Sequence, residues 1–187
     1  MIRTSLACLF VFLFGTPCLF AQASPQTSKP SPELEKQSFF VGTWKLEGTT
    51  KSSPFSRGGE KFDSVEHLEW MPGGFFLMAQ SYSAGKLAEL TIIGYDANEK
   101  VFTHTSFTSS GRTELWRGAA ENDSWTWTRD GKVDGKPVTE RLTIKKTSSN
   151  SYSFVQELKL AKEGNWFPVA EGTGIRSNDN ETRPKQG

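Results

Sequence analysis

Two histidines are the residues of this sequence best suited to acid–base chemistry or to metal binding. His67 and His104 are the only histidines, and neither belongs to an HExxH or a Cys/His metal-binding spacing. Along one predicted strand, His104 and Ser106 share a face, so the hydroxyl can come within reach of the imidazole. A Gly-x-Ser-x-Gly elbow is absent. The sequence therefore predicts no metal site and no catalytic residue, and an enzyme that uses His104 or His67 for acid–base chemistry is the alternative.

Carboxylate pairs and glycine-rich turns suggest no other chemistry. Glu66 and Glu69 have an odd spacing, which places them on opposite faces of a strand and removes the simplest acid–base dyad. The glycine-rich stretches lack the Lys-Ser/Thr ending and the following helix of a phosphate-binding loop. We therefore predict no cofactor.

Two tryptophans share one face of a predicted strand. Residues 124–128 alternate tryptophan with serine or threonine, so Trp125 and Trp127 point to the same side. Such a pair can pack in a core or form the aromatic wall of a site for an apolar or sugar-like ligand. A register shift of one residue would turn the inward-facing side chains of a strand outward. The predicted ligand-binding wall takes large apolar side chains from four strands: Trp70, Met78, Trp125, Trp127, Phe154 and Leu158.

Residues 1–23 have the composition of a secretory signal peptide. Arg3 precedes an apolar stretch at 6–14, and residues 21–23 form a small-x-small cleavage site. The stretch is shorter than the ~20 apolar residues of a spanning helix, and no later stretch approaches that length, so no membrane insertion is expected. Both cysteines fall in this segment. We expect a secreted or periplasmic chain that begins at Ser24 and has no disulfide.

The rest of the chain is expected to form one domain with balanced charge. Its length suits a single core at 33–176 between flexible tails at 24–32 and 177–187. Removing Arg3 from the 22 Lys and Arg of the sequence leaves as many bases as the 21 Asp and Glu. Acids and bases are interspersed without a basic run, which argues against nucleic acid or an anionic membrane as the main partner.

The elements that must position these side chains are strands. Ser31 and Pro32 predict the start of one short N-terminal helix that ends before Gly42. Beyond it, segments of alternating polarity are separated by short turns, which predicts antiparallel pairing throughout. Closure would remove the open edges, so we expect an all-β, closed, up-and-down barrel of about ten strands. The predicted strands are 43–50, 61–70, 75–83, 87–95, 101–108, 113–119, 124–133, 137–146, 151–161 and 166–175.

A series of short motifs is similar to a known family. In order and spacing they resemble the bacterial secreted domain-of-unknown-function family 1579, a set of lipocalin-like domains. The first motif follows a short helix and resembles the Gly-x-Trp opening of lipocalins and related calycin barrels. The resemblance covers about 34–176 and implies a calycin-like barrel and small-molecule binding, without catalytic residues to carry over. The motifs are Gly42-Thr43-Trp44, Trp70-Met71-Pro72-Gly73-Gly74-Phe75-Phe76, Gly94-Tyr95-Asp96, Val133-Asp134-Gly135-Lys136-Pro137 and Gly164-Asn165-Trp166.

These observations leave three functions open. A barrel of ten strands contains a cavity unless large side chains fill it. The leading hypothesis is a secreted, non-catalytic binding protein that encloses an apolar or amphipathic small molecule. The alternatives are the barrel enzyme and a solid barrel that acts through protein contacts.

Overall fold

The computed structural model describes residues 29–160 and 164–177. The predicted signal peptide at 1–23 lies outside the described residues, as do residues 24–28 of the predicted N-terminal tail and residues 178–187 of the predicted C-terminal tail. Among the described residues, no helix has the length and apolar composition needed to cross a membrane.

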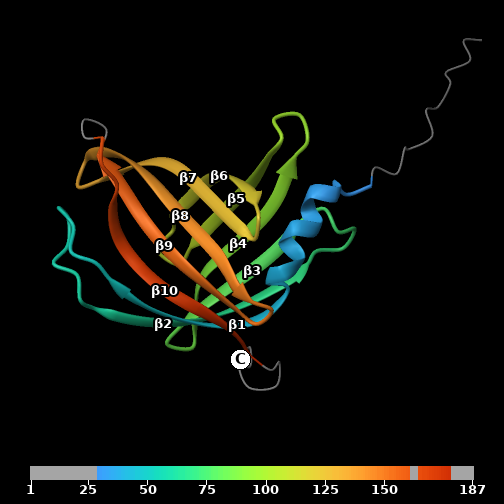
Figure 1. The fold of residues 1–187 in the computed structure, drawn as a ribbon, viewed down its shortest axis with the longest axis horizontal. Coiled ribbons are helices and arrows are strands. Elements are labelled where there is room, and N and C mark those ends of the chain that lie inside the picture. The colour runs from blue at the N-terminus through green and yellow to red at the C-terminus, as the bar shows by residue number, and fades with distance from the viewer. Residues whose placement is uncertain (1–28, 161–163, 178–187) are drawn as a thin grey trace, which may run out of the picture.

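Ten antiparallel strands close into a barrel (Figure 1). Each strand pairs with the next in the chain, and β1 pairs with β10 to complete the closure. The expected all-β, up-and-down architecture is thereby confirmed. The strands are β1 (Gly42–Thr50), β2 (Lys61–Trp70), β3 (Leu77–Ser83), β4 (Lys86–Asp96), β5 (Val101–Thr108), β6 (Thr113–Glu121), β7 (Ser124–Val133), β8 (Lys136–Ser148), β9 (Ser151–Leu160) and β10 (Phe167–Ser177).

The turns explain where strand ends differ from the prediction. β3 begins at Leu77, later than predicted, because residues 71–76 form a closed turn. In that turn the Met71 N–H donates to the Phe76 carbonyl at 2.9 Å, and the chain bends through Gly73 at a φ of 92°. The connection from β7 to β8 is a two-residue hairpin, with a positive φ at Asp134 and at Gly135.

In the part of the chain that the structure describes, one 3-10 helix, η1 (Pro32–Phe40), precedes the barrel and lies at one of its ends (Figure 1). The Ser31 hydroxyl accepts from the Glu33 N–H, and Pro32 occupies the start of the helix, as predicted. Leu34, Gln37 and Phe40 are buried. The helix therefore presents one face to the barrel interior.

Arg176 of β10 links this helix to the barrel through hydrogen bonds. Its guanidinium donates to the backbone carbonyls of Phe39 and Val41 and lies 4.3 Å above the Trp44 ring. The Trp44 indole N–H donates to the Phe40 carbonyl at 2.8 Å. Aromatic rings close this end of the barrel, and we call them the aromatic plug. The plug consists of Phe39, Phe40, Trp44, Trp125 and Tyr152.

Candidate functional site

A cavity of about 260 Å³ lies inside the barrel, next to the aromatic plug. Its volume is just below the ~300–1,000 Å³ of typical ligand pockets, so it suits a small molecule. One part of its surface is apolar and includes two indole rings. The apolar lining consists of Phe40, Leu68, Ala79, Ile93, Trp116, Trp127, Leu142 and Ile144.

The remaining lining is polar, which is unusual for a barrel interior. It includes three carboxyl groups, one imidazole and the side-chain amide of Gln37 from the helix. Gln37 is 0% exposed, and neither its amide nitrogen nor its amide oxygen has a hydrogen-bond partner among the described residues. A buried polar group without a partner costs free energy, so this amide is suited to a bound molecule that supplies the missing bonds.

Cross-strand register aligns the polar side chains on the inner wall. Glu66 of β2 is paired with Ser81 of β3, and Ser81 is paired with Glu89 of β4. The Ser81 hydroxyl donates to the Glu66 carboxyl at 3.1 Å. Burial, with a smaller contribution from the nearby Glu89, raises the pKa of Glu66 to about 7. Two carboxyl groups therefore flank one hydroxyl on the cavity wall.

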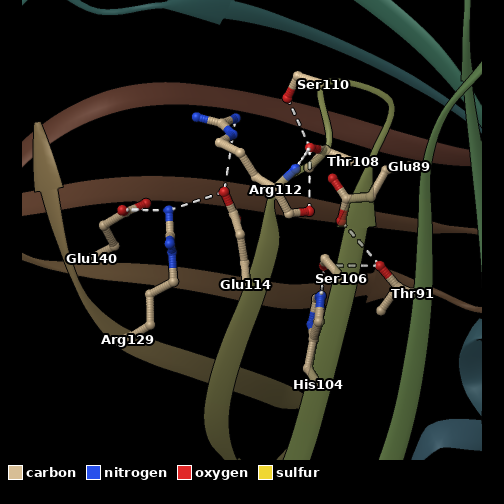
Figure 2. Close-up of polar contacts among 10 residues, drawn as sticks. All are labelled: Glu89, Thr91, His104, Ser106, Thr108, Ser110, Arg112, Glu114, Arg129 and Glu140. Atoms are coloured by element: carbon tan, nitrogen blue, oxygen red, sulfur yellow. Dashed lines mark hydrogen bonds and ion pairs between the residues drawn. The ribbon is translucent and has the colours of Figure 1, made fainter.

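A chain of hydrogen bonds runs from Glu89 to His104 (Figure 2). The Thr91 hydroxyl donates to the Glu89 carboxylate at 3.0 Å. Thr91 and Ser106 oxygens are 3.0 Å apart, and the Ser106 oxygen is 2.8 Å from His104 Nε2. Burial lowers the pKa of His104 to about 4, so the imidazole is neutral at pH 7.

Counting protons along this chain assigns the imidazole tautomer. Thr91 has one hydroxyl proton and gives it to Glu89, so the Thr91 oxygen accepts from Ser106. The Ser106 oxygen then accepts from His104, which places the ring proton on Nε2. The other ring nitrogen, Nδ1, is buried, has no hydrogen-bond partner among the described residues and holds a lone pair. His104 is therefore a hydrogen-bond donor to Ser106 and not a base that activates it.

Figure 2 also shows an ion-pair cluster, which adjoins the cavity through Glu114 of its lining. The Arg129 guanidinium is 2.6 Å from a Glu140 oxygen and 3.3 Å from a Glu114 oxygen. Arg129 also lies 4.9 Å from the centre of the Trp116 ring. Arg112 approaches Glu114 from the solvent side at 3.8 Å. Of the three carboxyl groups that line the cavity, Glu114 thus has a cationic partner within the barrel.

The structure places the six predicted wall residues in different surroundings. Trp127 lines the cavity. Trp125 shares its face, as predicted, but packs in the aromatic plug, 4.6 Å from Phe40 between ring centres. Three of the predicted residues lie on the inner faces of their strands but do not line the cavity: Trp70, Phe154 and Leu158. Met78 alternates with the buried Leu77 and Ala79, so it lies on the outer face of β3. Their role in ligand binding stays a prediction.

Sequence reasoning correctly paired His104 with Ser106, whose polar atoms are 2.8 Å apart, but it did not place polar side chains in an interior cavity. The sequence feature that could have identified them is an even spacing from apolar core residues of the same strand, which places polar side chains on the same, inward face. Glu66 has the parity of Leu68, and Ser106 and His104 have that of Phe102. His67 lies on the other face of β2, where its Nδ1 is 3.1 Å from the Thr43 hydroxyl. Across residues 29–160 and 164–177, no group of three or more potential ligands is arranged to hold a metal ion.

The chain is similar to solved β-barrel structures. Rv2717c from M. tuberculosis has 15% sequence identity and a TM-score of 0.52, and the match covers 80% of this chain and 100% of that chain. EF1p2_mFAP2b bound to DFHBI has 10% identity and a TM-score of 0.38, over 78% and 99% of the two chains. A redesigned β-barrel, b11L5F_LGL, has 11% identity and a TM-score of 0.36, over 81% and 100%.

No protein-family model matches the sequence, and no curated protein matches it significantly. At these identities, the likeness to Rv2717c supports the barrel fold alone.

Proposed function

We propose that this barrel binds a small amphipathic molecule in its interior cavity, without covalent chemistry. The observation that carries the proposal is a cavity of about 260 Å³ in which an apolar wall faces buried polar groups, one of them the unpartnered amide of Gln37. An apolar body would displace water from the indole rings of Trp116 and Trp127. Polar atoms of the same ligand would complete the hydrogen bonds that the protein leaves open.

The hydrogen-bond chain favours binding over the acid–base alternative. A nucleophilic serine needs a base that accepts its proton, with a third group that orients the base. Here the Ser106 proton goes to Thr91, and His104 donates to Ser106. The remaining imidazole nitrogen has no hydrogen-bond partner among the described residues, so no group orients the ring from that side. The site therefore holds protons in fixed positions instead of transferring them.

We also propose that the protein is an exported, lipocalin-like domain related to family 1579. The position of Trp44 directly after a short helix, at the start of β1, supports the resemblance of its motif to the lipocalin opening. The signal-like composition of residues 1–23 supports export. We expect the exported protein to begin at Ser24 or within two residues of it, which intact mass would show. A retained Cys8 or Cys18 would contradict this.

Filling the cavity should weaken binding strongly. Ala79 is 6% exposed and lines the cavity, so in Ala79→Leu the larger side chain would occupy the ligand's space. We expect Ala79→Leu to raise the Kd of 2-phenylethanol more than about tenfold, and to change the free energy of unfolding by less than about 1.5 kcal/mol because the added methyl groups enter empty space. Titration of tryptophan emission measures the affinity, and urea denaturation measures the stability.

The matched control adds the same side chain on the other face of the same strand. Gln80 follows Ala79 and points away from the interior. Gln80→Leu should bind 2-phenylethanol as the parent does. Equal affinity of parent and Ala79→Leu would place the ligand elsewhere. No binding to the parent by any neutral aromatic probe would instead favour a solid barrel that acts through protein contacts.

A further inference from the structure

We propose that the cavity selects a small cationic amine, whose ammonium group lies between Glu66 and Glu89 and whose apolar body lies against Trp116 and Trp127. This proposal rests on the proposed function and specifies the class of its ligand. Glu66, Ser81 and Glu89 are consecutive partners across three strands. Their side chains and both tryptophans line the same cavity. An amine with a short apolar body can reach both parts.

The charges around the cavity are unbalanced in favour of a cation. Its titratable side chains are Glu66, Glu89, Glu114, His104 and Tyr152. Glu114 has Arg129 as its partner, His104 is neutral at pH 7, and burial raises the pKa of Tyr152, which keeps its hydroxyl neutral. Glu66 and Glu89 receive hydroxyl hydrogen bonds, and neither has an ion-pair partner among the described residues. A bound ammonium would supply the missing positive charge.

The polar groups that lack partners are consistent with a donor-rich ligand. The assigned tautomer leaves a lone pair on His104 Nδ1, which has no donor. The Gln37 side chain is completely buried and lines the cavity, and among the described residues its amide oxygen has no donor and its amide nitrogen has no acceptor. With the carboxylates of Glu66 and Glu89, acceptors still outnumber donors on this wall. An ammonium has three N–H donors and no acceptor, whereas a carboxylate ligand would add acceptors to a site that already has a surplus. The cavity should therefore reject acids.

Three probes of the same size test the charge that the cavity selects. They share a phenyl ring and differ in the polar end: 2-phenylethylamine, which is protonated at pH 7, neutral 2-phenylethanol and anionic phenylacetate. By isothermal titration calorimetry, we expect the amine to bind more than about tenfold tighter than the alcohol, and phenylacetate to bind more than about tenfold weaker than the alcohol. Equal affinities for amine and alcohol would overturn the cation proposal and leave the proposed function intact. No binding of any probe would overturn both.

Carboxamide variants locate the ammonium. Glu66→Gln/Glu89→Gln should lose the preference for the amine over the alcohol, so that its affinities for the two probes differ by less than about twofold. Glu69→Gln is the matched control, because Glu69 lies on the opposite face of β2; it should leave the preference unchanged. A double variant that still prefers the amine more than about tenfold would contradict the proposed position.

Proton release provides a readout that does not require the double variant to fold. The pKa of Glu66 is about 7 in the empty barrel, so part of the population is protonated at pH 7. An ammonium beside this carboxyl group favours its ionised form. Amine binding to the parent should release a proton fraction, seen as a dependence of the binding enthalpy on the ionisation enthalpy of the buffer. Glu66→Gln alone should remove that dependence, and its persistence would overturn the assignment.

Discussion

Replacing Arg129 with methionine is expected to lower the free energy of unfolding by about 3–5 kcal/mol at pH 7. The substitution keeps much of the side-chain volume but removes the cation between Glu114 and Glu140, whose side chains are only 14% and 8% exposed. Two largely buried carboxylates would then be close together, and the exposed Arg112, 3.8 Å from Glu114, would be the remaining cation of the cluster. Urea denaturation of parent and variant measures the loss.

Two further variants identify the cause of that loss. Adding Glu114→Gln and Glu140→Gln to Arg129→Met removes both uncompensated charges and should recover most of the lost stability. Arg117→Met is the surface control, because Arg117 pairs with Glu99 where both side chains are more than half exposed. It should change the free energy of unfolding by less than about 1 kcal/mol. Similar losses for Arg117→Met and Arg129→Met would show that the buried cluster has no special role.

Glu66 and His104 are expected to give opposite pH dependences of stability. The pKa of Glu66 rises from 4.5 to about 7 on folding, so between these values the native state holds a proton that the unfolded state releases. Its contribution to stability therefore falls as pH rises from 4.5 to 7. The pKa of His104 falls from 6.5 to about 4, so the unfolded state binds a proton that the native state does not. Its contribution is lost as pH falls from 6.5 to 4.

Single variants separate these two contributions, which nearly cancel in the parent between pH 4.5 and 6.5. The free energy of unfolding of Glu66→Gln, taken relative to the parent, should increase by about 3 kcal/mol as pH rises from 4.5 to 7. That of His104→Gln should decrease by about 3 kcal/mol as pH rises from 4 to 6.5. Denaturation across this range, with each variant compared at matched pH, measures both. Slopes of the same sign would show that one of the two burial effects is misassigned.

Strand pattern and turn chemistry predicted most of the fold. Period-two alternation and the Asp134-Gly135 hairpin are local features. They depend on residues that are neighbours in the sequence, so they can be predicted without knowing how the barrel packs. The start of β3 was placed too early because Phe75 and Phe76 have high strand propensity, whereas the hydrogen bond from Met71 to Phe76 keeps them in a turn. Closure followed from the need to remove open edges.

The contact between His104 and Ser106 was predicted from one strand, but the arrangement of the carboxyl groups was not, because it depends on neighbours from different strands. Glu66, Ser81 and Glu89 become adjacent only through the register of β2, β3 and β4. Trp125 and Trp127 were correctly placed on one face. The sequence did not show that η1 would cover Trp125 with Phe40 and leave Trp127 beside the cavity. The pattern of large apolar side chains predicts which residues face the barrel interior. Where a cavity remains depends on how those side chains pack.

The location of a bound probe tests the central claim most directly. Intermolecular nuclear Overhauser effects should connect the ring protons of 2-phenylethylamine with the side chains of Trp116, Trp127 and Leu142, which line the cavity. The outer face of the barrel also offers apolar side chains, including Phe107 and Leu115, which are 46% and 69% exposed. Contacts to the cavity residues are the predicted result. Contacts restricted to Phe107, Leu115 and their outer neighbours would contradict an interior binding site.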